Sequence, residues 1–239
     1  TSIGDWRRRA PLQYGPPALE HQNRPRATIA PDEPWGDLGM HASSPSNHGA
    51  GDARTQRLNM VESQVRPSDV TDRRIIRAMS DIPREAFVPA QHQAVAYMDD
   101  AVPLILSAQG RVQRALLPPR TLAKMIQQAD LEADHAVLVV GAATGYTAAI
   151  LARTARKVVA VESDLALAER ATATFAAEKI ANVTVRTGPL TAGAKNDGPF
   201  DAILIDGAVS EMPQDLLDQL KEGGRLVAIV TTGGPGKVT

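Results

Sequence analysis

The chain has 239 residues, a formal net charge of −1 and no cysteine, and 43% of its residues are apolar. This length and apolar content suit one or two globular domains. The absence of cysteine excludes disulfides and thiol catalysis and favours a reducing compartment, so we expect a cytoplasmic protein. The balanced charge argues against binding to nucleic acid or to anionic membranes, and no apolar run is long enough to span a bilayer.

Residues 1–59 differ in composition from the rest of the chain. Residues 1–53 hold seven of the 17 prolines, three of the five histidines and both tryptophans, and their large aliphatic residues follow no regular period. Such a segment buries too little apolar surface to offset the roughly 1–2 kcal/mol that ordering each backbone residue costs. We predict a disordered extension over residues 1–59, with a flexible linker at 43–51 and no metal site. The folded domain is expected over 60–239, with Met60 as a candidate translation start.

Residues 60–118 form the expected helical, substrate-side part of this domain. A helix is predicted over 71–79, with either Thr71 or Ser68 as its N-cap. Its apolar face would consist of Val70, Ile75, Ile76 and Met79. The apolar stretch at 102–106 favours a strand.

Residues 119–239 form the expected cofactor-binding part, in which strands and helices alternate. Strands are predicted at 135–140, 157–162, 182–187, 200–206 and 223–230. Helices are predicted at 119–131, 147–155, 165–179 and 212–220. The continuous β-branched run at 135–140 is typical of a strand buried on both faces. This alternation predicts an α/β fold with a doubly wound, mostly parallel sheet.

The sharpest local feature is the Gly-rich turn in VLVVGAATGY (137–146), which joins a strand to a helix. The spacing of Gly141, Ala143 and Gly145 fits the G-x-G-x-G loop of S-adenosylmethionine enzymes. The same loop lacks two of the three glycines of a dinucleotide fingerprint, which argues against a nicotinamide oxidoreductase. Glu162 ends the next strand, where an acidic side chain can accept hydrogen bonds from ribose hydroxyls.

Several motifs along the domain act together as a family signature. They are IPREAFVP (82–89), AYMDD (96–100), VVGAATGY (139–146), VVAVE (158–162), NVTVRTG (182–188), PFDAILIDGA (199–208) and LLDQLKEGGRLV (216–227). In combination they resemble the protein-L-isoaspartate O-methyltransferase family over about residues 60–239. The resemblance implies a Rossmann-like, S-adenosylmethionine-dependent methyltransferase that methylates isoaspartyl carboxylates of damaged proteins or peptides for repair. A monomer is expected.

The resemblance also implies where the cofactor binds. The expected cofactor-binding residues are Gly141, Ala143, Gly145, Tyr146, Glu162, Gly188, Leu190 and Asp206. Two of these residues have alternative roles. Asp206 either contacts the cofactor or substrate, or it only caps the next turn. Tyr146 either packs beside the cofactor, or it only packs at the start of its helix.

Three positions depart from the family pattern, each by loss of a polar group. Leu117 stands where the family has a serine that faces the methyl-transfer site. Val139 stands where an acid usually precedes the Gly-rich loop, and the usual G-D-G after the third strand reads Gly188-Pro189-Leu190. Catalytic residues therefore stay unassigned, with two candidates. Asp99 either helps to shape the entrance for the substrate or only aids solubility. Arg120, like Arg114, either binds a carboxylate through two hydrogen bonds or is a solvated surface charge.

These departures leave two alternatives to the repair enzyme. Loss of the serine at Leu117 allows a methyltransferase with a different acceptor. Loss of polar cofactor contacts allows a non-catalytic, cofactor-binding module of the same fold. Because the chain stops soon after the fifth predicted strand, we also expect truncation at the C-terminus, with the closing strands absent and a sheet edge exposed.

Overall fold

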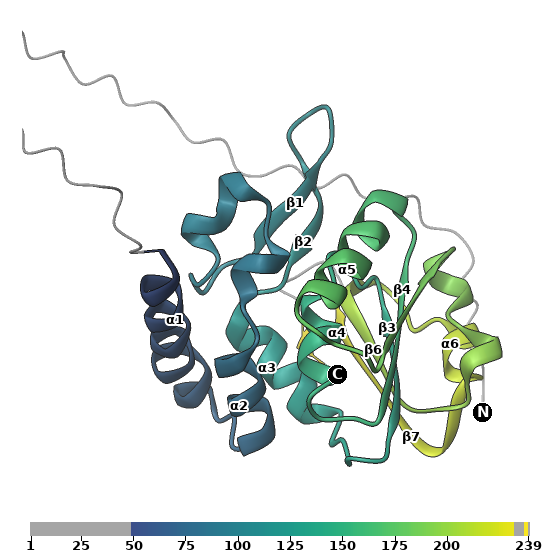
Figure 1. The fold of residues 1–239 in the computed structure, drawn as a ribbon. Coiled ribbons are helices and arrows are strands. Elements are labelled where there is room, and N and C mark those ends of the chain that lie inside the picture. Colours follow the sequence, from purple (N-terminus) through teal and green to yellow (C-terminus); the bar gives the residue numbers. More distant parts are fainter. Residues whose placement is uncertain (1–48, 232–236, 239) are drawn as a thin grey trace, which may run out of the picture. The chain divides into compact units, whose positions relative to one another are not determined.

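The computed structural model of the chain describes residues 49–231 together with residues 237 and 238 (Figure 1). These residues belong to a structural unit that runs from Ser46 to Thr239. Its first part is mostly helical. The elements there are α1 (Gly49–Met60), the π-helix η1 (Val61–Val65), the 3-10 helix η2 (Arg66–Ser68), α2 (Arg73–Asp81), and the 3-10 helices η3 (Arg84–Phe87) and η4 (Ala90–Val95). No described helix is long and apolar enough to cross a membrane.

Helix α1 begins earlier than the composition predicts. The prediction of disorder is wrong for residues 49–59, and the predicted linker at 43–51 runs into this helix. The helix has little apolar surface apart from Met60, which is buried in the core at its C-terminal end, and polar bonds also hold it in place. Arg57 donates to the carbonyl oxygen of Asp81 (2.7 Å) and lies 3.4 Å from the carboxylate of Glu85. The amino-acid composition of a segment cannot reveal such long-range bonds. Residues 1–48 lie outside the described residues.

Helix α2 confirms the predicted apolar face but has a different N-cap. Val70, Ile75, Ile76 and Met79 are all buried. The cap is Asp72, whose carboxylate accepts a hydrogen bond from the backbone N–H of Arg74 (2.8 Å), and not Thr71 or Ser68. The hydroxyl of Ser68 instead donates to the carbonyl oxygen of Val65.

A two-stranded antiparallel hairpin follows, formed by β1 (Val102–Leu106) and β2 (Val112–Leu116). The first strand matches the predicted one at 102–106. The second was not predicted, because VQRAL alternates poorly between apolar and polar residues. The hairpin separates the helical part from the main sheet in the chain (Figure 1).

The main sheet has six strands in the order β5-β4-β3-β6-β7-β8. The strands are β3 (Ala136–Val140), β4 (Lys157–Glu162), β5 (Val183–Thr187), β6 (Phe200–Val209), β7 (Leu220–Val230) and β8 (Lys237–Val238). The first five are parallel to one another. The predicted doubly wound, mostly parallel sheet is thus confirmed, and all five predicted strands are present.

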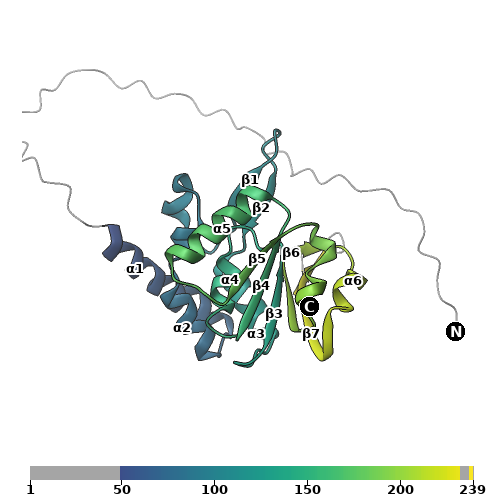
Figure 2. The ribbon, with the colours of Figure 1, turned by 45° about the vertical axis from the view of Figure 1, so that its right-hand side comes forward.

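Both faces of the sheet are covered, as the β-branched runs predict (Figure 2). Val137 and Val139 of β3 join one core cluster, and Leu138 and Val140 join another on the opposite face. The helices of this region are α3 (Pro119–Gln128), α4 (Tyr146–Leu151), α5 (Leu165–Ala177) and α6 (Gln214–Leu217), with 3-10 turns η5 (Leu190–Ala192) and η6 (Lys195–Asp197). Helices α2 to α5 contribute to the first cluster, and α6 and η5 contribute Leu216 and Leu190 to the second.

Strand β8 corrects part of the expectation about the sheet edge. Val238 and Lys237 pair antiparallel with Ile229 and Val230 of β7. The expected absence of closing strands is therefore wrong for these two residues. The unpaired backbone groups at the edge of β7 account for this pairing, since even a short segment can satisfy them.

The strand order places a switch point between β3 and β6. From β3 the chain proceeds outward to β4 and β5, and it then crosses back to β6 and β7 on the other side of β3. In such sheets the loops after the two central strands diverge and leave a crevice beyond their carboxyl ends. The Gly-rich loop and the end of β6 therefore border the expected ligand site.

Candidate active site

The Gly-rich loop is anchored to the end of β4. The backbone N–H groups of Gly141 and Ala142 both donate to the carbonyl oxygen of Val161 (2.9 and 3.0 Å). The N–H of Ala143 donates to a carboxylate oxygen of Glu162 (2.8 Å). Gly141 has φ +77° and Ala143 has φ +51°, so the chain turns sharply at both positions.

Glu162 is fully buried at the end of β4, and its carboxylate organises the loops around it. One oxygen accepts from Ala143, and the other accepts from the backbone N–H groups of Ser163 (2.8 Å) and Asp164 (3.0 Å). Arg114 of β2 lies 3.5 Å from the same carboxylate. Each oxygen of an ionised carboxylate has two lone-pair sites, so Glu162 retains limited capacity for a ribose hydroxyl.

Gly145 and Tyr146 lie in the core and do not line the cavity described below. A Cβ atom at Gly145 would come within 2.5 Å of the ring of Phe175. The ring of Tyr146 is fully buried, with its centroid 5.6 Å from that of Phe87 and 4.8 Å from the guanidinium of Arg84. These two positions therefore secure the packing of the loop and of helix α4.

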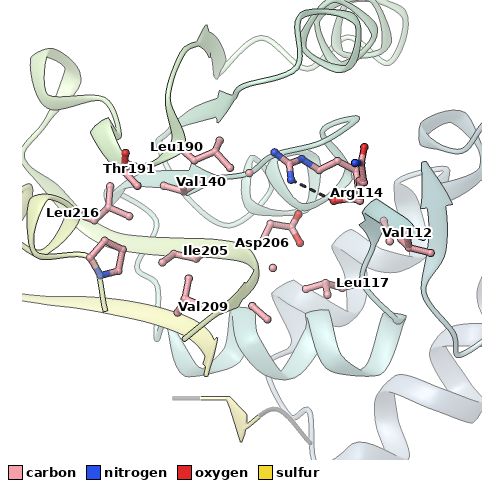
Figure 3. A pocket seen from close by; sticks show the side chains of 16 residues that line it. Val112, Arg114, Leu117, Val140, Leu190, Thr191, Ile205, Asp206, Val209 and Leu216 are labelled. Atoms are coloured by element: carbon pink, nitrogen blue, oxygen red, sulfur yellow. Dashed lines mark hydrogen bonds between the residues drawn. The ribbon is translucent and has the colours of Figure 1, made fainter. Parts of the chain in front are cut away.

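A cavity of about 380 Å³ lies at the switch point (Figure 3). Its walls come from the hairpin and the segment after it, the start of the Gly-rich loop, η5, the end of β6 and helix α6. The lining residues are Val112, Gln113, Arg114, Ala115, Leu117, Val140, Gly141, Leu190, Thr191, Ile205, Asp206, Gly207, Ala208, Val209, Pro213 and Leu216. The charged residues in this lining are Arg114 and Asp206, and most of the others are apolar.

Three of the predicted cofactor-binding residues meet in this cavity: Gly141, Leu190 and Asp206. A Cβ atom at Gly141 would lie 3.5 Å from the carbonyl oxygen of Asp206 and 3.8 Å from the side chain of Leu190. The structure thus brings together positions that are far apart in sequence. Gly188 lies near by at the end of β5, where its N–H donates to the carbonyl oxygen of Glu162 (3.0 Å).

Leu117 and Asp206 come from different segments and both line the cavity (Figure 3). Leu117 follows the hairpin, and Asp206 follows the buried part of β6. Burial raises the pKa of the Asp206 carboxyl to about 6, against the lowering effects of a hydrogen bond with Thr147 and of the Arg84 charge. A buried oxygen of this carboxyl, Oδ1, has no hydrogen-bond partner among the described residues.

Arg84 is a functional candidate that sequence reasoning missed. It is fully buried below the site, where it donates to the carbonyl oxygens of Ala96 (2.7 Å) and Leu117 (2.8 Å). It therefore ties the segment that carries Leu117 to helix α4 through Tyr146. The one signal in the sequence was a charged residue inside the family motif IPREAFVP, and that signal does not reveal burial.

Arg114 lies between two hollows. It lines the switch-point cavity and also a second, more open hollow of about 460 Å³, which Ser163 and Asp164 help to line. Its guanidinium donates to the hydroxyl of Ser163 (2.9 Å) and approaches Glu162. Arg114 thus lines the candidate site. This position is necessary for one of its two predicted roles, that of binding a carboxylate.

The two catalytic candidates from the sequence lie elsewhere. Asp99 and Arg120 form an ion pair with each other, and neither lines the cavity. Glu132, Asp134 and His135 cluster at a turn, but the Nδ1 of His135 accepts a hydrogen bond from the N–H of Glu132 (3.1 Å). This cluster gives no reason to infer a metal centre.

The residues at the switch point fit S-adenosylmethionine. The backbone at Gly141 leaves room for close approach of a ligand, and Glu162 ends the neighbouring strand, where ribose hydroxyls are bound in this class of sheet. The fold and this site together define the class of the protein: a Rossmann-like, S-adenosylmethionine-dependent methyltransferase.

Comparisons with known proteins narrow the class to a family. The model of the family "Protein-L-isoaspartate(D-aspartate) O-methyltransferase" matches residues 55–236. The chain is 38% identical over 177 residues to the protein-L-isoaspartate O-methyltransferase of Methanoculleus marisnigri, covering 74% of this chain and 78% of that protein. It is 39% identical over 173 residues to the Herpetosiphon aurantiacus enzyme of the same name, covering 72% and 75%. This chain belongs to the protein-L-isoaspartate O-methyltransferase family.

Solved structures agree with this assignment. One protein-L-isoaspartate O-methyltransferase superposes with a TM-score of 0.64 and 26% identity, over 74% of this chain and 55% of that chain. A Plasmodium falciparum protein described as a putative member, in complex with S-adenosyl-L-homocysteine, gives a TM-score of 0.64 over 76% of this chain and 87% of its own. Its identity of 18% supports the shared fold alone.

Proposed function

We propose that this chain transfers a methyl group from S-adenosylmethionine to isoaspartyl carboxylates in proteins or peptides, as a repair enzyme. The observation that carries the proposal is the switch-point cavity, whose lining includes Gly141 and Asp206 together with Leu117. Leu117 occupies the position at which the family pattern has its serine. Candidate cofactor-side and acceptor-side residues therefore line the same cavity.

The cofactor supplies an activated methyl group on a sulfonium. Gly141, Glu162 and Leu190 are the residues that would hold it, Gly141 by close backbone approach and Glu162 at the ribose. An acceptor carboxylate is already ionised at neutral pH, so the site needs no strong general base. The protein's main tasks are to hold the acceptor in line and to exclude water, and such positioning can lower a barrier by roughly 7–11 kcal/mol.

Arg114 is the proposed cationic partner of the acceptor carboxylate. It is the charged donor in the cavity lining, and a guanidinium can bind a carboxylate through two parallel hydrogen bonds. Asp99 and Arg120 stay outside this assignment because they pair with each other. We also propose a monomer in the cytoplasm with no nucleic-acid partner, supported by the absence of cysteine and the charge of −1.

A methyltransferase with a different acceptor is the second candidate. The observation that favours it is Leu117, which offers no hydroxyl to the acceptor. This candidate keeps the same cofactor and the same cavity, so only the choice of acceptor separates the two.

The test is isothermal titration of the full chain with S-adenosylmethionine, followed by methyl transfer to an isoaspartyl peptide. We expect saturable cofactor binding and transfer to that peptide, with no transfer to the same peptide containing ordinary aspartate. Transfer to another protein group or to a small molecule, with none to the isoaspartyl peptide, would favour the second candidate. Absence of cofactor binding would refute the proposed function.

A further inference from the structure

The acceptor end of the cavity has an uneven distribution of polar groups. In the segment after the hairpin, Leu117 presents only carbon atoms, although Gln113 and Arg114 of β2 also line the cavity. From β6, Asp206 presents a carboxyl group to the same cavity (Figure 3). Beside Leu117, a carboxyl group thus comes from β6, while the segment after the hairpin contributes no hydroxyl.

The Asp206 carboxyl has an unused hydrogen-bonding position. Its Oδ1 atom is buried and has no partner among the described residues, while the group also interacts with the Thr147 hydroxyl. A buried polar oxygen without a partner costs about 1–3 kcal/mol, so a group retained in this state calls for an explanation, such as a catalytic role or a bound water or ion. An ionised carboxylate could only accept there, whereas the neutral form can donate.

The charges that face Asp206 come from several elements. Arg84 of η3 favours the ionised form, and Glu162 of β4 disfavours it. Arg114 of β2 lines the same cavity, and Tyr146 of α4 is buried behind it with its hydroxyl unpartnered. Burial outweighs the favourable groups and holds the pKa of Asp206 at about 6, close to the working range of an intracellular enzyme.

We propose that Asp206, in its neutral form, donates a hydrogen bond to the acceptor carboxylate and so replaces the hydroxyl that Leu117 lacks. This inference rests on the proposed function, because it requires a carboxylate acceptor. An ionised Asp206 would repel that acceptor, since two adjacent carboxylates cannot both stay charged in a buried site. Acceptor binding therefore requires a proton on Asp206.

The transfer step itself consumes no proton. A lone pair of the acceptor oxygen that faces the cofactor forms the new C–O bond with the methyl carbon. The C–S bond breaks, and its electron pair stays on sulfur, which becomes a neutral thioether. Asp206 keeps its proton and holds the second oxygen of the acceptor throughout, while Arg114 balances the acceptor's charge before transfer.

A direct readout is the number of protons taken up when the acceptor binds. The experiment titrates an isoaspartyl peptide into the full chain, saturated with S-adenosylhomocysteine, at pH 7 in two buffers of different ionisation heat. The wild type should take up about one proton per peptide, because Asp206 is mostly ionised when free and neutral when the peptide is bound. Asp206→Asn should take up none.

Rates supply a second readout. Above the pKa of Asp206, kcat/KM of the wild type for the isoaspartyl peptide should fall about tenfold per pH unit, because the neutral fraction falls by that factor. Asp206→Asn carries an amide donor at every pH, so its profile should be flat over pH 6–8. Asp206→Ala should lose about tenfold at pH 6, and adding Leu117→Ser should restore part of the loss.

The matched control is Asp215→Asn on helix α6, an exposed acid that does not line the cavity. It should take up the same proton as the wild type. Equal proton uptake by Asp206→Asn and the wild type would overturn the inference. So would an Asp206→Asn variant that loses cofactor affinity about tenfold and leaves peptide affinity unchanged. No peptide binding by the wild type would instead identify a failure of the proposed function.

Discussion

The two outer glycines of the Gly-rich loop have different tasks. Gly141 faces the cavity, where a methyl group would meet only the carbonyl oxygen of Asp206 and the side chain of Leu190 at ordinary contact distance. Gly145 faces the core, where Phe175 of α5 and the side chain of Ala171 occupy the space that a Cβ atom would need. The shared motif therefore combines a position that lines the cavity with a position that packs in the core.

Alanine substitutions should separate these tasks. Gly145→Ala should lower the free energy of unfolding by about 2–4 kcal/mol, because it adds both a core clash and backbone strain. Gly141→Ala should cost only the strain at positive φ, about 1–2 kcal/mol, and should weaken cofactor binding about tenfold or more by filling the cavity. Urea denaturation and titration with S-adenosylmethionine check both. Equal stability losses with unchanged cofactor affinity would contradict this division.

At the scale of elements, the N-terminus of α2 depends on a single capping side chain. The Asp72 carboxylate accepts from the N–H of Arg74 and also pairs with the Arg74 guanidinium (2.7 Å). Asp72→Ala should therefore destabilise the fold by about 1–2 kcal/mol. Thr71→Ala is the matched control and should be close to neutral, because Thr71 contributes its backbone N–H, which bonds to Gln127, and not its hydroxyl. A larger loss in the control, measured by the shift of the urea midpoint, would show that the cap lies at Thr71.

How far the sequence predicts each element depends on whether the signal is local. The buried strands β3 and β4 follow from runs of β-branched residues, and their bounds were predicted within a residue. Helix α6 is much shorter than the predicted helix at 212–220. The reason is that Leu220 belongs to β7, where it pairs with Phe200 of β6. Helix α1 was missed because Arg57 anchors it through bonds to residues more than twenty positions away.

The same difference between local signals and long-range contacts applies to the candidate site. The Gly-rich loop and Glu162 follow from spacing, since both lie at strand ends. The burial of Arg84 and the placement of Asp206 and Leu117 in one cavity depend on how the hairpin folds over the sheet, and no local pattern encodes that. The sequence left two roles open for Asp206, and the cavity favours contact with a ligand over a simple turn cap.

For the whole molecule, cofactor binding should be linked to global stability. The switch-point cavity draws its walls from the hairpin, the Gly-rich loop, η5, β6 and α6, so a ligand there contacts segments from Val112 to Leu216. A ligand that binds only the folded state stabilises it by RT ln(1 + [L]/Kd), about 2.7 kcal/mol at a concentration of 100 Kd. For a domain of this size that should raise the midpoint of thermal unfolding by about 5–10 °C.

The measurement should follow far-ultraviolet circular dichroism with and without S-adenosylmethionine. Tryptophan fluorescence would be the wrong probe, because the tryptophans of the chain are Trp6 and Trp35, which precede the described residues and the domain that binds the ligand. Gly141→Ala is the control, since it should unfold as cooperatively as the wild type yet, with cofactor affinity about tenfold weaker, show only about half of the wild-type shift at the same cofactor concentration. A ligand that contacts so many separate segments must oppose their separation on unfolding. If the midpoint of the wild type rises by less than about 1 °C at saturation, the ligand therefore binds outside the switch-point cavity.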